Sequence, residues 1–222
     1  MRRDLVTATI AIFVLTVLLG VVYPLLITGV GQLAFPGDAN GQKVYVDGRL
    51  VGSKIIGQSF SRVKQTFPGG GKPEEKAGAI VTEPDPRYFQ PRPSATEGGA
   101  YDAAASTFSN RGPNSKLTEE ADAEAIKGYL QLNGPYDRGL TTAQVPVDAV
   151  NTSASNLDPE ISEANAHIQA HRVAALRHLS LRAVDALVAR HTSGRGLGFS
   201  GEPGVNVLEL NLELDRLAAG GA

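Results

Sequence analysis

The first 35 residues carry the strongest pattern in the chain, an apolar run that no charged side chain interrupts. Residues 5–35 contain no Asp, Glu, Lys, Arg or His. A helix of about 20 apolar residues crosses a hydrocarbon core about 30 Å thick. One charged side chain at its centre would cost roughly 2.5–3.5 kcal/mol on insertion scales. The pattern therefore predicts one transmembrane helix over residues 5–27, followed by a juxtamembrane linker over residues 28–42.

The charges beside this run predict its orientation. Arg2 and Arg3 precede it, whereas the segment PGDANGQ that follows carries only Asp38. Because positive flanks stay on the cytoplasmic side, residues 1–4 are expected in the cytoplasm and the chain beyond Phe35 outside. The alternative is a cleaved signal peptide. It is disfavoured because the run is longer than a usual signal-peptide core and no small-residue cleavage site follows promptly.

Short alternating and helical patterns follow the apolar run. Residues 43–46 and 49–51 flank Asp47-Gly48, which supplies the positive φ angles of a two-residue turn, so a β-hairpin is predicted. Apolar positions at helical spacing predict a helix over residues 116–132, which Gly134-Pro135 ends.

The C-terminal third is expected to hold two more helices and a strand that turns into a helix. Asp158 is predicted to cap a helix whose first position is Pro159. The predicted apolar side of this helix consists of Ile161, Ala164, Ile168, Ala175 and Leu179. A second helix is expected over residues 181–191. Residues 205–215 begin with the alternation of a strand and continue as a helix that Asn206 would cap.

Together these elements predict an α+β fold: one N-terminal transmembrane helix followed by a single mixed α/β soluble domain. The part after the span is long enough for one hydrophobic core. We expect the domain to cover residues 43–217, with a loop insertion at residues 62–86 and a flexible tail at residues 218–222.

Composition narrows the class of function. The chain has no cysteine, which excludes disulfides and thiolate metal sites. Its net charge of −2 at pH 7 gives no indication of a nucleic-acid partner. The segment Gly69–Lys72 is not a phosphate-binding loop, because Pro73 follows the lysine where Ser or Thr is required. No nucleophile–base pair or paired-carboxylate spacing is present either.

Three histidines offer an alternative chemistry. His167 and His171 lie one helical turn apart and His178 follows two turns later, a spacing that suits zinc. Ile168 follows His167, however, so the glutamate of a metalloprotease helix is missing. Solvated histidines on a polar face are favoured, and no metal site is predicted.

Two segments are candidates for recognition. Arg92 stands between two prolines, which fix an extended backbone and direct the guanidinium. It would either bind a carboxylate or carbonyl of a partner or form an internal salt bridge, and composition does not decide between these. The helix start at Asp158 and Pro159 could bind an anion through its N–H groups, unless Asp158 itself satisfies them.

Five motifs, in this order, resemble one bacterial family. They are TGVGQLAFPGDANG at the end of the apolar run, VGSKIIGQSF, YFQPRPSA, SASNLDPEIS followed by QAHRVA, and LGFSGEPGVNVLELNLELD. Together they make nearly the whole chain resemble KdpC, the C subunit of the bacterial potassium-transporting P-type ATPase.

The resemblance implies a non-catalytic accessory subunit of a high-affinity, ATP-driven potassium uptake pump in the bacterial plasma membrane. Its implied partners are a potassium-binding channel-like subunit (KdpA), the P-type ATPase subunit (KdpB) and a small membrane peptide (KdpF). ATP and potassium would be handled by the complex, with no cofactor bound tightly to this chain. The family is described as stabilising the complex and as a catalytic chaperone that promotes ATP binding by the pump subunit.

The resemblance also implies roles for particular residues. A glutamine after the LDP motif is implicated in the ATP-related role, and Gln169 stands in its place. Partner contacts are expected at Tyr88, Phe89, Arg92, Asp158 and Pro159. The chain departs from the family pattern where Asn156 replaces a glycine, His171 a proline and Gly204 an arginine.

The predicted orientation conflicts with a direct nucleotide role, because it places Gln169 outside the cell whereas ATP is cytoplasmic. Any effect on ATP affinity would then be indirect, with the domain over the external mouth of the potassium-binding subunit. The alternative hypothesis is a membrane-anchored exported enzyme or binding domain with a histidine metal site.

Overall fold

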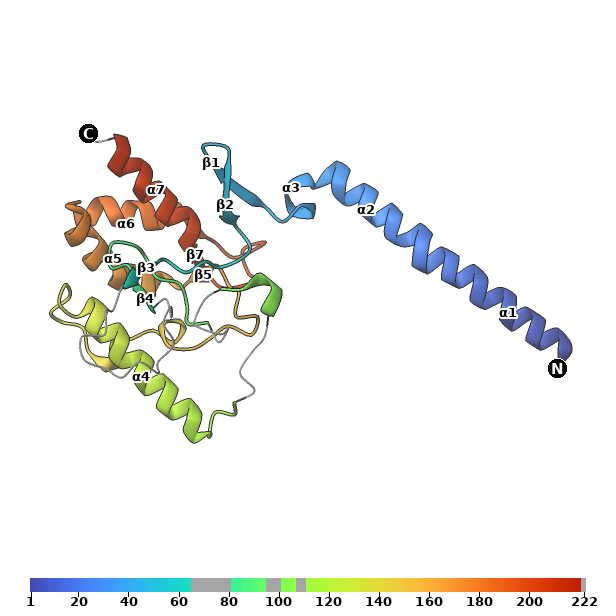
Figure 1. The fold of residues 1–222 in the computed structure, drawn as a ribbon, viewed down its shortest axis with the longest axis horizontal. Helices are drawn as coiled ribbons and strands as arrows, with labels where there is room; N and C mark the ends of the chain where they lie inside the picture. Colours follow the sequence, from blue (N-terminus) through green and yellow to red (C-terminus); the bar gives the residue numbers. More distant parts are fainter. Residues whose placement is uncertain (65–80, 95–100, 107–110, 221–222) are drawn as a thin grey trace, which may run out of the picture. The chain divides into compact units, whose positions relative to one another are not determined.

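The computed structural model describes residues 1–64, 81–94, 101–106 and 111–220, and it divides into two compact units, residues 1–53 and 54–222 (Figure 1). The segment Gly69–Lys72 and most of the predicted insertion at residues 62–86 lie outside the described residues.

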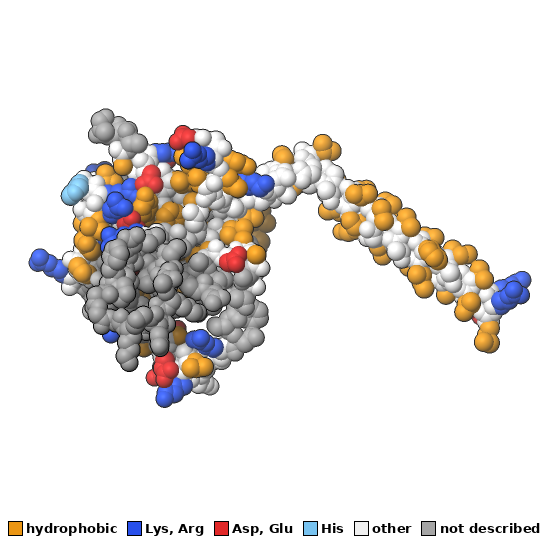
Figure 2. Space-filling view, in the orientation of Figure 1, with side chains coloured by type: hydrophobic (Ala, Val, Ile, Leu, Met, Phe, Trp, Pro, Cys, Tyr) orange, Lys and Arg blue, Asp and Glu red, His pale blue; other side chains and the backbone are white. Residues whose placement is uncertain are grey.

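The first unit begins with one long helical rod. α1 (Arg2–Val17), the π-helical turn η1 (Leu18–Val22) and α2 (Tyr23–Ala34) follow one another without a break, 33 residues in all. At 1.5 Å per residue the rod is about 50 Å long, more than a hydrocarbon core requires. It is apolar enough to cross a membrane and none of its side chains is buried, which confirms the predicted span as the single candidate among the described residues. Figure 2 shows hydrophobic side chains along the rod and basic side chains at its N-terminal end.

A short helix and a hairpin complete this unit. α3 (Pro36–Ala39) precedes β1 (Lys43–Val46) and β2 (Arg49–Ser53), which pair antiparallel. Asp47 and Gly48 have φ values of 49° and 76°, the left-handed backbone that a two-residue hairpin turn needs. The predicted hairpin is confirmed.

The second unit is an α+β domain with two small antiparallel sheets. β3 (Ser61–Lys64) pairs with β4 (Val81–Pro84). The other sheet has the order β5–β7–β6, made by Glu160–Ile161, Gly204–Asn206 and Thr192–Ser193. In this sheet Val205 of the central strand pairs with both Ile161 and Thr192. The predicted fold class is confirmed.

Four longer helices surround these sheets: α4 (Lys116–Asn133), α5 (Glu163–Arg177), α6 (Leu181–Arg190) and α7 (Val207–Gly220). The described residues also form the short 3-10 turns η3 (Ala103–Ala105), η4 (Thr142–Gln144) and η5 (Val147–Ala149). The predicted helices over 116–132 and 181–191 are confirmed. So is the strand that turns into a helix, where the Asn206 side chain accepts a hydrogen bond from Glu209 N at 3.1 Å.

The predicted start of α5 is wrong. The helix begins at Glu163, and its N-cap is Ser162, whose Oγ accepts a hydrogen bond from Asn165 N at 3.1 Å. Asp158 instead accepts a bond from Glu160 N at 3.0 Å, and Pro159 precedes a strand rather than opening a helix. The physical reason is that β5 pairs with β7, a partner from the far end of the chain that the local sequence does not reveal.

The core lies between α5, α6, α7 and one segment after β4. Its largest fully buried apolar side chains are Phe89, Ile161, Leu187, Leu208, Leu210, Leu214, Val173, Val184, Val188 and Val205. Ile161 is buried and Leu179 packs against the core, but the predicted apolar side of α5 is partly wrong, because Ala164 and Ala175 are exposed. Asn165, Gln169 and Arg172 are buried in their place, since their polar groups find partners inside the domain.

Candidate functional site

The three buried polar side chains of α5 lie on one side of the helix. Asn165, Gln169 and Arg172 are only 1%, 2% and 0% exposed. Gln169 and Arg172 face the segment that follows β4, residues 85–91. A polar group taken out of water without a partner costs stability, so the hydrogen bonds of these side chains decide what they do.

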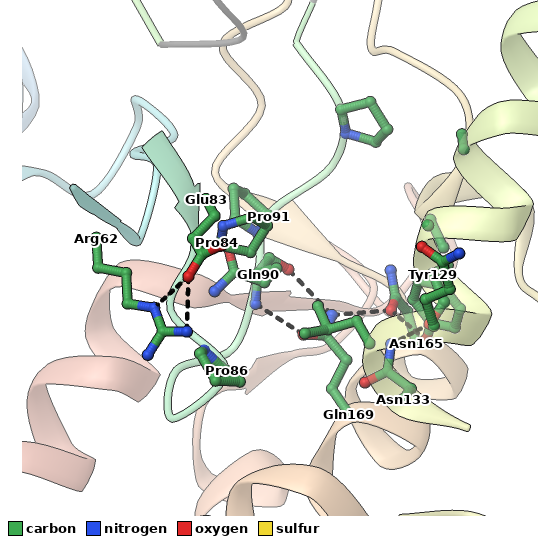
Figure 3. Close-up of a pocket in the computed structure, with 16 residues that line it drawn as sticks. Arg62, Glu83, Pro84, Pro86, Gln90, Pro91, Tyr129, Asn133, Asn165 and Gln169 are labelled. Carbon is green, nitrogen blue, oxygen red and sulfur yellow. Dashed lines mark hydrogen bonds and ion pairs between the residues drawn. The ribbon is translucent and has the colours of Figure 1, made fainter. Parts of the chain in front are cut away.

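The Gln169 amide is fully used by its neighbours (Figure 3). Its Oε1 accepts hydrogen bonds from Gln90 N at 2.7 Å and from Arg172 Nη2 at 2.8 Å. Its Nε2 donates to Gln90 O at 3.0 Å and to Asn165 Oδ1 at 2.9 Å. An amide side chain has two N–H donors and two acceptor lone pairs. All hydrogen-bonding groups of the Gln169 amide therefore have partners inside the domain.

A second side-chain amide holds the preceding residue in the same way. Asn211 of α7 is fully buried; it accepts a bond from Phe89 N at 2.9 Å and donates to Phe89 O at 2.9 Å. We call these two pairs, Gln169 with Gln90 and Asn211 with Phe89, the amide clamp. The clamp fixes two successive residues of the segment from two different helices.

Arg172 supports the clamp with a fully buried guanidinium. Its Nε donates to Asn133 Oδ1 at 2.9 Å, its Nη1 to the carbonyl oxygens of Pro86 and Tyr88, and its Nη2 to Gln169. Burial lowers the pKa of Arg172 to about 10, because desolvation disfavours the charged form. The group stays charged at neutral pH, and neutral oxygens stabilise that charge.

The network continues to α4 and to η5. Tyr129 donates its hydroxyl to Asn165 Oδ1 at 2.9 Å, and Asn165 Nδ2 donates to Asp148 Oδ2 at 2.9 Å. Asp148 also accepts bonds from the backbone and hydroxyl of Ser162, at 2.8 and 2.7 Å. Burial raises the pKa of Tyr129, so this side chain acts as a neutral hydroxyl donor.

A pocket of about 620 Å³ opens beside the network (Figure 3). Four prolines in and beside the segment (Pro84, Pro86, Pro91 and Pro93) form one wall, and α4 contributes the other with Ala125, Gly128, Tyr129 and Leu132. The Arg62–Glu83 ion pair, at 2.7 Å, lies in its lining. Its size suits a small ligand, but Asn165 and Gln169 in its wall are hydrogen-bonded within the domain.

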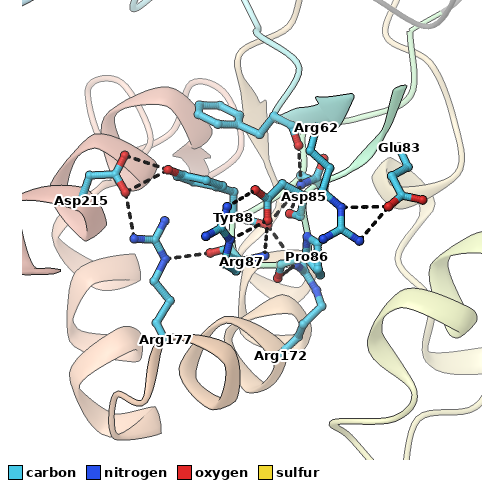
Figure 4. Close-up of polar contacts among 11 residues, drawn as sticks. Arg62, Glu83, Asp85, Pro86, Arg87, Tyr88, Arg172, Arg177 and Asp215 are labelled. Carbon is cyan, nitrogen blue, oxygen red and sulfur yellow. Dashed lines mark hydrogen bonds and ion pairs between the residues drawn. The ribbon is translucent and has the colours of Figure 1, made fainter. Parts of the chain in front are cut away.

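On its other side the segment is covered by a stacked group (Figure 4). The Tyr88 ring stacks on Phe60 with centroids 5.4 Å apart, and the Arg177 guanidinium lies 4.4 Å from the Tyr88 centroid. The Tyr88 hydroxyl donates to Asp215 at 3.1 Å, and Arg177 pairs with Asp215 at 2.8 Å. Arg177 Nε also donates to Arg87 O at 2.9 Å, so α5 and α7 both hold this surface.

The turn into the segment is closed by an ion pair. Asp85, 5% exposed, accepts bonds from the backbone N, Nε and Nη2 of Arg87 at 3.0, 3.1 and 2.7 Å. These bonds hold the pKa of Asp85 below its usual value, because they favour the carboxylate. The Gln90 side chain donates to the carbonyl oxygens of Phe60, Asp85 and Tyr88, which completes the turn.

Sequence comparison decides the family. The profile of KdpC, described as the K+-transporting ATPase c chain, matches residues 5–216. This chain belongs to the KdpC family. Relatives named Potassium-transporting ATPase KdpC subunit include those of Mycobacterium tuberculosis (46% identical, over 98% of this chain and 100% of the relative), Methylococcus capsulatus (48%; 95% and 96%) and Streptomyces coelicolor (42%; 96% and 92%). The resemblance noted in the motifs is confirmed.

The KdpC residues expected to contact a partner or nucleotide lie largely inside the domain. Gln169 belongs to the amide clamp, and a direct contact with ATP would require it to give up one of its hydrogen bonds. Phe89 is fully buried, so its side chain belongs to the core, while Tyr88 is half-buried. The ATP-related role of Gln169 stays a prediction.

The other three expected contacts lie together. Arg92 Nη1 and Asp158 Oδ2 form an ion pair of 3.0 Å, which is the internal salt bridge of the two possibilities left open by the sequence. The carbonyl oxygen of Pro159 accepts a bond from Val207 N at 3.0 Å, at the start of α7. Contacts of these residues with another subunit stay predictions.

Two histidines of this KdpC chain have other contacts or positions in the structure. His167 Nδ1 lies 2.9 Å from Asp185 Oδ1 and joins α5 to α6, and His178 ends α5 with a left-handed φ of 56°. Within the described part of the chain, no three His, Asp or Glu residues gather closely enough to hold a metal ion.

Sequence reasoning missed Asn165, Arg172 and Asn211. A signal for one of them was available, since Asn211 lies three residues from both Leu208 and Leu214 and so shares their apolar face. The departure at Asn156, where the resemblance implies glycine, fits the backbone geometry, because Asn156 has a φ of 57°. Asn adopts this left-handed conformation more readily than most residues.

Proposed function

We propose that this chain is the non-catalytic accessory subunit of an ATP-driven potassium uptake pump in the bacterial plasma membrane. It assembles with a potassium-binding channel-like subunit (KdpA), a P-type ATPase subunit (KdpB) and a small membrane peptide (KdpF). It stabilises this complex and promotes ATP binding by the pump subunit without touching the nucleotide. Family membership over residues 5–216 and the names of the relatives support the assignment to this pump.

The observation that carries the indirect mechanism is the saturated amide of Gln169. Its two donors and its acceptor oxygen are bound to Gln90, Asn165 and Arg172, and the side chain is 2% exposed. A group in this state orders the segment it holds and offers nothing to a ligand. Gln169 therefore acts on the pump through the shape of the segment around Gln90.

The charges at the N-terminus support the same mechanism. Arg2 and Arg3 precede the apolar rod, so the positive-inside rule directs the second unit to the outer side of the membrane. ATP is on the opposite side. The histidine metal domain is not proposed, because His167 is engaged by Asp185 and no described cluster supports a metal.

Membrane topology provides the test. Single cysteines replace the exposed Asp47 and Ala175 in the otherwise cysteine-free chain, within the assembled pump in intact cells. A small membrane-impermeant maleimide is expected to label both. Labelling only after lysis would overturn the orientation and make direct nucleotide contact possible again.

A second measurement addresses the nucleotide itself. In the purified complex a photoreactive ATP analogue is expected to label the pump subunit and not this chain. Gln169→Ala is expected to raise the KM for ATP with a smaller change in kcat, because the segment loses its fixed shape. Labelling of this chain at α5 would contradict the indirect mechanism.

A further inference from the structure

The loop between β6 and β7 holds two large apolar side chains in water. Leu197 is 90% exposed and Phe199 is 75% exposed, more than any other large hydrophobic side chain in the described part of the second unit. We call these two side chains the apolar tip. Single exposed apolar residues are common on surfaces, but here one loop presents two of them.

The loop is held in one shape by its own hydrogen bonds. Gly196 and Ser200 exchange two backbone bonds, of 2.7 and 2.8 Å, and Phe199 N donates to Gly196 O at 3.2 Å. Arg195 and Glu202 close its base with an ion pair of 2.5 Å. The tip is therefore presented by an ordered turn, which lowers the entropy lost when it binds.

The turn does not itself require these side chains. Leu197 has a left-handed φ of 53°, next to Gly198 at 81°. That backbone disfavours leucine, and glycine or asparagine would suit it better. A bulky apolar residue kept at a strained, exposed position indicates a role outside the fold of this chain.

We propose that the apolar tip, Leu197 with Phe199, is an anchor that inserts into an apolar socket on another protein subunit of the same membrane complex; this inference rests on the proposed function. An aromatic side chain buries roughly 150–250 Å², and a stable independent interface needs about 800 Å² from each partner. Two side chains are thus too few to hold a second copy of this chain in solution. A subunit confined to the same membrane has a high effective concentration, so a small anchor suffices.

A lipid surface fits the tip less well. Within the described loop the cation, Arg195, is already paired with Glu202, whose side chain is 80% exposed. Because this pair carries no net charge, the described loop offers no unpaired basic residue to attract anionic headgroups. An apolar socket in a protein requires no such attraction.

Crosslinking in the assembled pump tests the proposal. A photoreactive benzoylphenylalanine replaces Phe199 in the full chain, and the purified complex is irradiated. A covalent adduct with another subunit is expected. Adducts with lipid alone, with a second copy of this chain, or with nothing would each overturn the proposal.

Matched variants give a second readout. The tip variant carries both Leu197→Ser and Phe199→Ser. The control variant carries Leu117→Ser and Val147→Ser, which change two other exposed apolar side chains. Burial of both tip residues corresponds to a factor of roughly 10²–10⁴ in association, so only the tip variant is expected to dissociate during purification. Both variants should unfold at the wild-type temperature. If both variants remained bound to the pump equally well, the proposed anchor would be overturned. A wild-type chain that never co-purifies with the pump would instead overturn the proposed function.

Discussion

The side-chain amide of Gln169 and the backbone of Gln90, 79 positions apart, exchange two hydrogen bonds of 2.7 and 3.0 Å. Two residues of neighbouring antiparallel strands make the same exchange, with backbone groups on both sides. Here one helix side chain replaces the missing strand, and Asn211 does the same for Phe89. Two helices thus satisfy the backbone groups of Phe89 and Gln90.

Replacement of Gln169 by alanine is expected to lower the free energy of unfolding by about 2–4 kcal/mol. The change leaves the backbone N–H and C=O of Gln90 unpaired in a buried place, and it removes the acceptor of Arg172. Urea unfolding of the full chain in mild detergent, followed by circular dichroism, measures this. Gln131→Ala, at an exposed position of α4, is the control and should change stability by less than about 0.5 kcal/mol. Equal midpoints for the two variants would show that water replaces the clamp without cost.

The two halves of the clamp are expected to be coupled. Gln169→Ala and Asn211→Ala each release one of two adjacent residues, and release of either lets water reach the other. The double variant should therefore lose about 0.5–3 kcal/mol less stability than the sum of the single variants. A double-mutant cycle from the same urea titrations gives this difference. Strict additivity would mean that Phe89 and Gln90 are held independently.

Arg172→Lys is expected to destabilise the domain by about 2–4 kcal/mol although it keeps the charge. A lysine ammonium is a compact group and cannot span Asn133, the Pro86 carbonyl and Gln169 as the planar guanidinium does. Some buried acceptors would then lose their donors. The control is Arg182→Lys at an exposed position of α6, and similar thermal midpoints for the two variants would contradict the role given to Arg172.

The elements that could be predicted from the sequence are those whose cause is local. Asp47-Gly48 specifies its own turn, and the apolar run of residues 5–35 needs no partner to be identified. The prediction of where α5 starts was wrong because β5 pairs with β7, which joins Ile161 to Val205. No residue near Asp158 indicates this pairing.

The buried polar residues of the candidate site were not predicted, in part for the same reason. Asn165, Gln169 and Arg172 are polar, so helical periodicity assigns them to solvent, yet their partners come from residues 86–90 and 129–148, far away in sequence. Gln169 was found through the family resemblance. Its physical role follows from the clamp, which requires the fold.

The corrected start of α5 leads to a prediction about local stability. Ser162→Ala removes the N-cap and a bond to Asp148, and should cost about 1–2 kcal/mol. Asp158→Ala removes the ion pair with Arg92 but leaves the cap. Hydrogen exchange at the first-turn amides of α5 should therefore become faster in the first variant and stay unchanged in the second. The opposite result would restore Asp158 as the cap.

The pKa of Asp85, held low by Arg87, predicts how stability changes in acid. The unfolded chain takes up this proton near the ordinary pKa of about 3.9, whereas the folded chain resists it until a lower pH. The unfolded state binds more protons in that interval, so stability falls as the pH drops. The contribution of Asp85 is fully present above about pH 5 and is lost as the pH falls through the folded-state pKa.

Asp85→Asn removes this titration while keeping the size of the side chain. The stability difference between wild type and variant should stay constant from about pH 5 to 7 and shrink below about pH 4, because only the wild-type carboxylate is then neutralised. Urea midpoints across this range measure the difference. Glu124→Gln, at an exposed position of α4, serves as the control and should show a nearly flat difference. A flat difference for Asp85→Asn as well would mean that the Arg87 bonds do not favour the charged carboxylate, and that the turn before the clamp is held by the backbone bonds and the Gln90 side chain alone.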